Sequence, residues 1–112
     1  MYYYGVEVLR VVDGDTVDVV VDLGFNVWHK CRVRMVGINA PESRTRDLEE
    51  KEKGLAAKKW LKKRLGNTSV ELQSQGKGKY GRVLGEFYID EININQEMIE
   101  VGHAVAYFGG KR

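Results

Sequence analysis

The segment from residue 16 to residue 23 constrains the fold most, because apolar and polar side chains alternate along it. Successive side chains of a strand point to opposite sides, so one face carries apolar residues and the other carries Asp18 and Asp22. The apolar face consists of Val17, Val19, Val21 and Leu23. One apolar and one charged face are typical of a half-buried antiparallel strand. The segment therefore predicts a sheet with a core on one side and solvent on the other.

Four further strands are predicted from runs of apolar and β-branched residues that end at glycine, asparagine or aspartate. They cover residues 4–12, 28–38, 69–73 and 83–89. In the third predicted strand, the alternation places Arg34, Val36 and Ile38 on one face. A basic, glycine-rich loop is expected at residues 75–81, and a short extended piece at residues 104–108.

Two helices are predicted from apolar residues that recur every three or four positions. The first covers residues 55–65 and can begin as early as Leu48, with Gly54 as the alternative start because glycine weakens a helix interior. The second is short, capped by Asn95 and ended by Gly102. Three strands, a helix, two strands and a helix predict an α+β, mainly β domain. This is the element order of an OB-type five-stranded barrel with two to three packed helices.

Length and composition are those of one globular domain, which we expect to span residues 1–112 as a monomer. No run of 18 apolar residues indicates a membrane span, and no basic segment followed by an apolar one indicates a secretory signal. A cytoplasmic location is the default expectation. Cys31 is the only cysteine, so an internal disulfide is excluded and a cysteine-based metal site is not supported.

The charge is unevenly distributed along the chain, although the net charge is only +2. Residues 43–65 carry nine Lys or Arg against four Asp or Glu, whereas residues 83–101 carry five acids and no Lys or Arg. Two readings stay open. Both segments can be ordinary solvated faces, or the basic side can face a polyanion such as a nucleic acid.

Chemistry is indicated first by the end of the third predicted strand. Arg34 stands in an apolar run, where a cation needs an anionic partner, and Pro41 fixes the turn just before Glu42. An arginine fork can hold a phosphate and a carboxylate can handle water, which are the two requirements of phosphodiester hydrolysis. The alternative is a structural ion pair of Arg34 with Glu42 or Asp15.

Three weaker signals lie elsewhere. The turn at residues 13–16, Asp-Gly-Asp-Thr, is a common hairpin turn, but its carboxylates can also ligate a hard cation. The glycine-rich loop ends in Arg82 and fits phosphate contact, although a solvated loop is the default. Tyr107 can stack on a base or simply pack.

Together these motifs resemble the staphylococcal nuclease (thermonuclease) family. They are Asp-Gly-Asp-Thr at residues 13–16, Arg-x-x-Gly-Ile-x-Ala-Pro-Glu at 34–42, Lys-Tyr-Gly-Arg at 79–82 and Gly-x-Ala-x-Ala-Tyr at 102–107. The resemblance implies an OB-type barrel with packed helices. It also implies calcium-dependent hydrolysis of DNA and RNA, single strands preferred, to products with 3′-phosphates.

The resemblance also implies roles for individual residues. Arg34 and Arg82 would bind the scissile phosphate, and Glu42 would position or deprotonate the attacking water. The calcium ligands would be Asp15, Asn39 and the backbone carbonyl of Ala40. The nucleotide site would be lined by Lys79, Tyr80 and Tyr107.

The chain departs from the family pattern at three places. Asn39 stands where an aspartate is usual, which removes one negative charge from the expected calcium site. Gly78 stands where an aspartate is frequent, and we expect a fold that is C-terminally truncated relative to longer family members. The Asn39 departure motivates a second hypothesis: a catalytically weak or inactive OB module that binds single-stranded nucleic acid or a protein partner.

Overall fold

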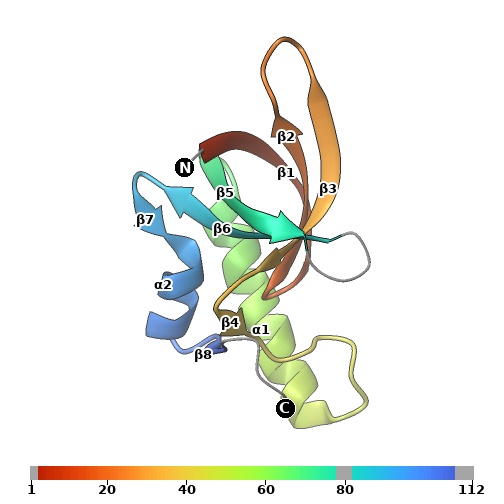
Figure 1. Ribbon diagram of the computed structural model, residues 1–112. Coiled ribbons are helices and arrows are strands. Elements are labelled where there is room, and N and C mark those ends of the chain that lie inside the picture. The colour runs from red at the N-terminus through yellow and green to blue at the C-terminus, as the bar shows by residue number, and fades with distance from the viewer. Residues whose placement is uncertain (1–2, 78–81, 108–112) are drawn as a thin grey trace.

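Five strands close into a barrel in the computed structural model, which describes residues 3–77 and 82–107 (Figure 1). Neighbouring strands pair antiparallel, except that β3 and β6 run parallel and close the barrel. The mainly β, OB-type fold predicted from the sequence is thereby confirmed. The barrel strands are β1 (Tyr3–Asp13), β2 (Thr16–Asp22), β3 (Trp28–Met35), β5 (Val70–Lys77) and β6 (Val83–Ile89).

The alternating segment forms β2, and the valines of its apolar face lie inside the barrel as predicted. Val17, Val19 and Val21 are buried there. Leu23 is not, because β2 ends at Asp22 and Leu23 is exposed in the following turn. Val19 lies between Val8 of β1 and Cys31 of β3 in the register of the sheet. The neighbouring strands supply matching inward residues, so the alternation of β2 sets which side of the barrel wall faces solvent.

Two helices pack on the described part of the barrel. Helix α1 (Leu48–Leu65) lies along β1, and helix α2 (Ile94–Glu100) contacts β6. The longer of the two expected starts is correct for α1. Its N-cap is Asp47, whose carboxylate accepts the backbone N–H groups of Glu49 and Glu50. The helix continues through Gly54 without a break.

The predicted cap of α2 is wrong. The N-cap is Asn93, whose side chain accepts the N–H of Gln96. Asn95 lies one position inside the helix and is buried, with 2% of its surface exposed. The two asparagines are equally good caps by residue type, so only the buried hydrogen-bond partners of Asn95 distinguish them.

The third strand is shorter than predicted, because the chain turns between Met35 and Ile38. Gly37 has φ +80°, a conformation that glycine adopts without strain. The chain then forms β4 (Ile38–Asn39), which pairs with β8 (Val105–Ala106). Arg34, Val36 and Ile38 therefore do not continue one strand face, and Ile38 is buried.

Two other boundaries differ from the expectation. Strand β5 continues to Lys77, so the first part of the expected loop is strand, while residues 78–81 lie outside the described residues. A short strand, β7 (Ile92–Asn93), pairs with β6 just before α2. In the described part of the chain, no helix is long and apolar enough to cross a membrane.

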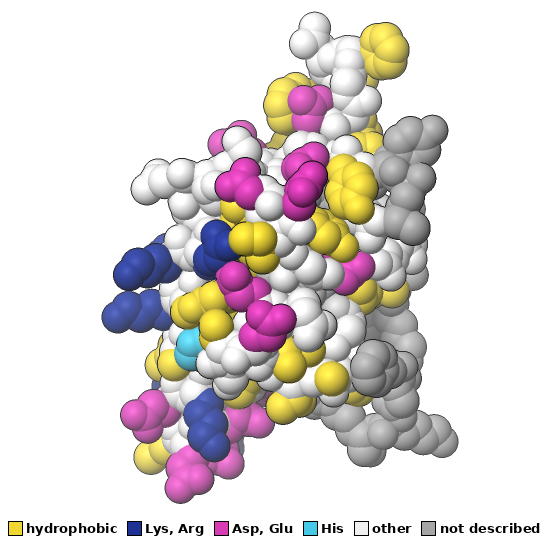
Figure 2. Space-filling view, turned by 90° about the vertical axis from the view of Figure 1, so that its left-hand side faces the viewer, with side chains coloured by type: hydrophobic (Ala, Val, Ile, Leu, Met, Phe, Trp, Pro, Cys, Tyr) yellow, Lys and Arg dark blue, Asp and Glu magenta, His cyan; other side chains and the backbone are white. Residues whose placement is uncertain are grey.

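The uneven charge of the sequence reappears on the surface. Acidic side chains gather on the face formed by β7 and α2, and Lys and Arg side chains lie toward the edge where α1 runs (Figure 2). One link joins the two regions, since Arg64 of α1 donates to Glu97 of α2 at 2.6 Å. The two predicted charge regions thus lie on different sides of the barrel.

Candidate active site

Two arginines lie at the seam that closes the barrel, Arg34 in β3 and Arg82 directly before β6. Arg34 of β3 pairs in register with Leu84 of β6, two residues beyond Arg82. Both arginines line one cavity of about 650 Å³, and Tyr107 lines it from the segment after β8. The backbone N–H of Tyr107 donates to the carbonyl of Gly37 at 2.9 Å, which fixes this residue beside the turn.

The guanidinium of Arg34 is held by the turn that ends β3. Its Nη2 donates to the carbonyl of Ile38 at 2.8 Å, and its Nη1 donates to the carbonyl of Met35. These two bonds fix the plane of the guanidinium group. Arg34 is therefore a positioned cation at the edge of the cavity, as a phosphate-binding fork requires.

Asp15 lies next to this arginine, with its Oδ2 atom 3.7 Å from the Nη2 of Arg34. The same oxygen accepts the backbone N–H of Ala40 at 3.0 Å, and Oδ1 accepts the hydroxyl of Thr16 at 3.1 Å. The Asp15 backbone carbonyl also accepts the N–H of Met35 at 2.8 Å. The structure thus brings Asp15, Arg34 and Ala40 together from three segments.

Asn39 and Glu42 line a different cavity from the arginines. It has a volume of about 540 Å³ and lies between the 39–42 segment, the start of α1 and the chain before β8. The side chain of Glu42 is exposed, and Asn39 is half-buried. The predicted site is therefore divided between two neighbouring cavities, with Asp15 and Ala40 at the junction.

The loop that carries Glu42 is anchored to the Asp-Gly-Asp-Thr turn by Ser43, a residue that the sequence did not single out. Ser43 is buried, and both its backbone N–H and its hydroxyl donate to Oδ1 of Asp13. On the other side the loop lies against Gly54 of α1. The turn that holds Asp15 therefore also positions Glu42, through Asp13.

Asn95 links the turn after β3 to strand β6, next to the cavity that Arg34 lines. Its Oδ1 accepts the N–H of Phe87, and its Nδ2 donates to the carbonyls of Val36 and Gly85 at 2.9 and 3.1 Å. Since Val36 follows β3 and Gly85 lies in β6, this side chain ties the turn beside Arg34 to the closing strand. A buried asparagine with three backbone partners is costly to replace.

The three predicted calcium ligands offer only oxygen atoms, the donor type that hard cations prefer. Asp15, the amide of Asn39 and the carbonyl of Ala40 are all oxygen donors of the kind that Ca²⁺ prefers. Within residues 3–77 and 82–107, no three His, Cys, Asp or Glu side chains gather as a metal-binding group. Any cation here would thus depend on one carboxylate supported by neutral oxygens.

Two of the predicted nucleotide-binding residues, Lys79 and Tyr80, lie outside the described residues. Cys31 is partly buried in β3 and packs against the core, as expected for a small inward residue. Burial raises the pKa of its thiol, with the charge of Asp18 as a second cause. This environment suits packing rather than nucleophilic chemistry.

A closed five-stranded barrel with two arginines at its parallel seam, and a carboxylate beside one of them, defines an OB-type barrel with a cavity lined by two arginines. The chain belongs to the family of staphylococcal nuclease homologues, whose family model matches residues 32–112.

Its relatives include proteins named as nucleases. The thermonuclease of Staphylococcus intermedius is 33% identical over 90% of this chain and 58% of the relative. An uncharacterized endonuclease of Escherichia coli is 32% identical over 89% of this chain and 59% of the relative. An uncharacterized protein of Methanocaldococcus jannaschii is 32% identical over 95% of this chain and 60% of the relative. The chain thus spans about three fifths of the length of these relatives.

Proposed function

We propose that this chain is a calcium-dependent nuclease that hydrolyses phosphodiester bonds of DNA and RNA to products with 3′-phosphates. The observation that carries the proposal is the cavity shared by Arg34 and Arg82. A phosphodiester anion repels an incoming nucleophile, and two guanidinium groups would neutralise it and favour the more negative transition state. Tyr107, on the same cavity, would contact the sugar or base.

Calcium would be held by Asp15, Asn39 and the backbone carbonyl of Ala40. When bound there, it would supply further positive charge beside the phosphate and orient water. Asp15 is already fixed by the N–H of Ala40 and the hydroxyl of Thr16, so its position would cost little to organise. Carboxylate oxygens have more lone pairs than these two bonds use.

Glu42 would orient or deprotonate the attacking water. Its loop is held by Asp13 and by the close approach to Gly54, while its side chain stays exposed at the second cavity. Lys79 and Tyr80, which lie outside the described residues, would complete the nucleotide site.

The proposal is tested by incubating single-stranded DNA with the protein, with calcium or with a chelator. We expect cleavage that requires calcium and that falls at least a hundredfold in Glu42→Gln, which keeps the shape of the side chain but loses its basicity. Lack of cleavage by the unmodified protein at every calcium concentration would refute the nuclease. Equal cleavage by Glu42→Gln would refute only the role of Glu42.

One observation favours a second function, a nucleic-acid-binding barrel with little or no catalysis. Asn39 and Glu42 line a different cavity from the two arginines, and Asn39 is neutral. Binding a phosphate requires the arginines but not Glu42. A protein that binds single-stranded DNA, does not cleave it and is insensitive to Glu42→Gln would have this second function.

A further inference from the structure

The outer face of β3 carries a row of residues that the proposed active site does not use. Trp28, Lys30 and Arg32 alternate with inward-facing positions and lead from the hairpin tip to Arg34. The register with β2 is unbroken from Trp28 to Arg34, so these four side chains share one face of the strand. The first three are exposed, and Trp28 has 56% of its surface in solvent.

The hairpin between β2 and β3 extends this row into an apolar tip that projects from the barrel (Figure 1). Leu23 and Val27 are about half exposed and Phe25 is fully exposed. The tip is nevertheless an ordered turn. Leu23 and Val27 are joined by a backbone hydrogen bond of 2.9 Å, and Asp22 accepts the N–H of Gly24 at 2.8 Å. An exposed aromatic ring in this turn, at Phe25, and a second at the start of β3, at Trp28, indicate a contact surface.

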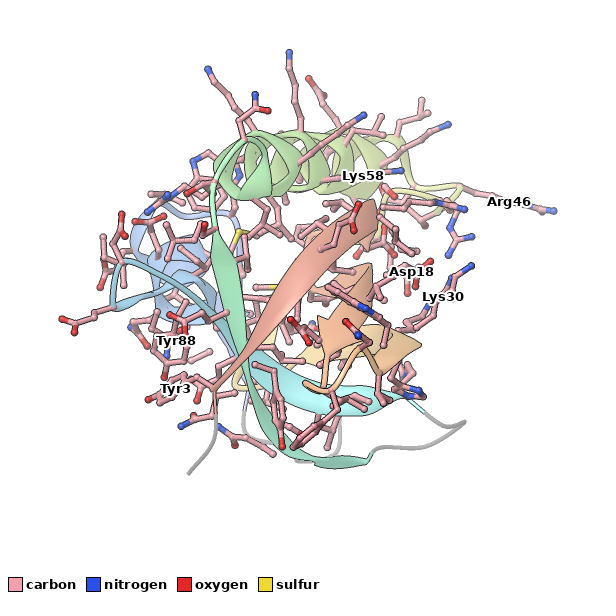
Figure 3. The ribbon with its side chains drawn as sticks, turned by 90° about the horizontal axis from the view of Figure 1, so that it is seen from above. Tyr3, Asp18, Lys30, Arg46, Lys58 and Tyr88 are labelled. Carbon is pink, nitrogen blue, oxygen red and sulfur yellow. The ribbon has the colours of Figure 1, made fainter. Side chains whose placement is uncertain are left out.

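Near the middle of this row, several cationic side chains surround the carboxylate of Asp18. Asp18 of β2 stands opposite Arg10 of β1 and Arg32 of β3. Arg32 donates to it at 2.7 and 3.2 Å, which leaves Arg10 and Lys30 as additional cations around the same carboxylate. Asp18 and Lys30 lie on the same side of the barrel, as do Arg46 and Lys58 (Figure 3). The Arg32–Asp18 pair holds the guanidinium against the wall while almost half of it stays exposed.

We propose that this face of β3 is a binding track for single-stranded nucleic acid, with phosphates at Lys30 and Arg32 and bases stacked on Trp28 and Phe25. The inference rests on the proposed function, since it extends the strand that would lie in the Arg34–Arg82 cavity. Six residues of strand separate Trp28 from Arg34, a distance of ~20 Å. A stacked strand rises ~3.4 Å per phosphate and an extended single strand covers more, so the track would take at most about six nucleotides.

Single strands fit this track better than duplexes. Base faces must be free to stack on aromatic rings, and in a duplex they are covered by the neighbouring base pairs. Trp28 and Phe25 are close in sequence and separated by a tight turn, so they can contact successive or nearby bases. The cations spaced along β3 would follow the backbone of the strand without reading its sequence.

The test measures binding without cleavage, by fluorescence anisotropy of labelled oligothymidylates in a chelator. A probe of 3 nucleotides is short enough to occupy the cavity alone, whereas a probe of 12 nucleotides would also cover the track. We expect Trp28→Ala to weaken binding of the 12-mer about tenfold and to leave the 3-mer unchanged, with Trp28→Phe restoring most of the loss. Phe25→Ser, at a fully exposed position, provides a second variant with no packing to lose.

Lys30→Ala should weaken binding of the 12-mer and reduce the slope of log affinity against log salt concentration by about one. Matched controls lie on other elements: Ile92→Ala removes an exposed apolar side chain of β7, and Lys63→Ala removes an exposed cation of α1. Neither control should change binding of the 12-mer.

Equal affinity of the 12-mer for Trp28→Ala, Phe25→Ser and the controls would overturn the track. The proposal would also be overturned if Trp28→Ala weakened binding of a 12-base-pair duplex as much as binding of the single-stranded 12-mer. Binding to anionic vesicles that depends on Trp28, with no effect of Trp28→Ala on DNA binding, would overturn it as well. The outcome is separable from that of the proposed function. Calcium-dependent cleavage without a Trp28 effect would refute the track alone, and Trp28-dependent binding without cleavage would refute the nuclease alone.

Discussion

A Cβ atom added to Gly54 of α1 would lie 2.3 Å from the carbonyl oxygen of Glu42. It would also lie 2.7 Å from the backbone nitrogen of Ser43. These distances are too short for any real contact, and the atoms they involve are backbone atoms that cannot turn aside. The helix therefore lacks a side chain at this position because the loop that carries the proposed general base lies directly on it.

This contact predicts an unusual sign for Gly54→Ala. In an ordinary helix interior this change stabilises by about 1 kcal/mol, because alanine is the better helix former. Here the loop must shift, and we expect a loss of about 1–3 kcal/mol in the free energy of unfolding, together with slower cleavage. Urea denaturation measures the first effect. Ala56→Gly, at an exposed position of the same helix, is the matched control and should cost about 1 kcal/mol by propensity alone. A Gly54→Ala protein more stable than the unmodified one would contradict the contact.

The two asparagines at the start of α2 provide a second prediction. Asn93→Ala removes a helix cap and should cost about 1 kcal/mol in the free energy of unfolding. Asn95→Ala should cost more, about 3 kcal/mol, because the N–H of Phe87 and the carbonyls of Val36 and Gly85 lose their buried partner. Chemical denaturation of both variants gives the comparison. Equal losses would mean that Asn95 contributes no more than a cap.

The ion pair between Arg32 and Asp18, on the outer face of the barrel, predicts a small dependence of stability on pH. The hydrogen bond from Arg32 is the main cause that holds the pKa of Asp18 below its ordinary value of 3.8; burial opposes it, and the charges of Arg32, Arg10 and Lys30 add to it. A carboxyl whose pKa is lower in the folded state stabilises the protein above the unfolded value, and this contribution disappears as the pH falls below 3.8.

The expected magnitude is small because the Arg32 side chain is 47% exposed. Asp18→Asn should reduce the free energy of unfolding by less than about 1 kcal/mol at pH 7, and the difference should vanish in acid. Thermal melts between pH 7 and pH 3 measure it, with Glu100→Gln, an exposed acid at the end of α2, as the control. A difference that grows on acidification would contradict this interpretation of the pair.

Asn39 permits a direct test of the proposed cation site. Replacing it by aspartate restores a charge without changing the shape of the side chain, so Asn39→Asp should tighten calcium binding. Calorimetry with calcium alone measures the affinity independently of cleavage. Unchanged or weaker affinity in Asn39→Asp would exclude this residue as a ligand.

The barrel and its long helix follow from the sequence because their signals are local and repeated. Alternation along residues 16–23 defined the buried side of the wall, and helical spacing defined α1. The chain order of strands and helices then matched one known barrel. These features need only residue types and their periods.

The finer features of the site did not follow, because they depend on contacts between distant segments. The turn at Gly37 interrupts an apolar run that reads as one strand, and the β4–β8 pairing that accompanies it joins residues far apart in the chain. Gly54 reads as a helix breaker until the Glu42 loop is placed on it. Asn95 reads as a cap until its partners in the core are known. The hydrogen bonds between Ser43 and Asp13 could not be predicted, since an aspartate in a turn and a serine in a loop are both common.

The central claim is that Arg34 and Arg82 bind the same phosphate, and single-turnover cleavage of single-stranded DNA with calcium tests it most directly. We expect Arg34→Lys and Arg82→Lys each to slow cleavage about 10²–10³-fold, since lysine cannot present the planar fork. In the double variant, the fold-decrease in the cleavage rate should be smaller than the product of the two single fold-decreases, because both arginines contact one phosphate. Arg46→Lys, in the exposed loop before α1, is the control and should cleave normally. Cleavage at the unmodified rate by either Arg34→Lys or Arg82→Lys would contradict the account.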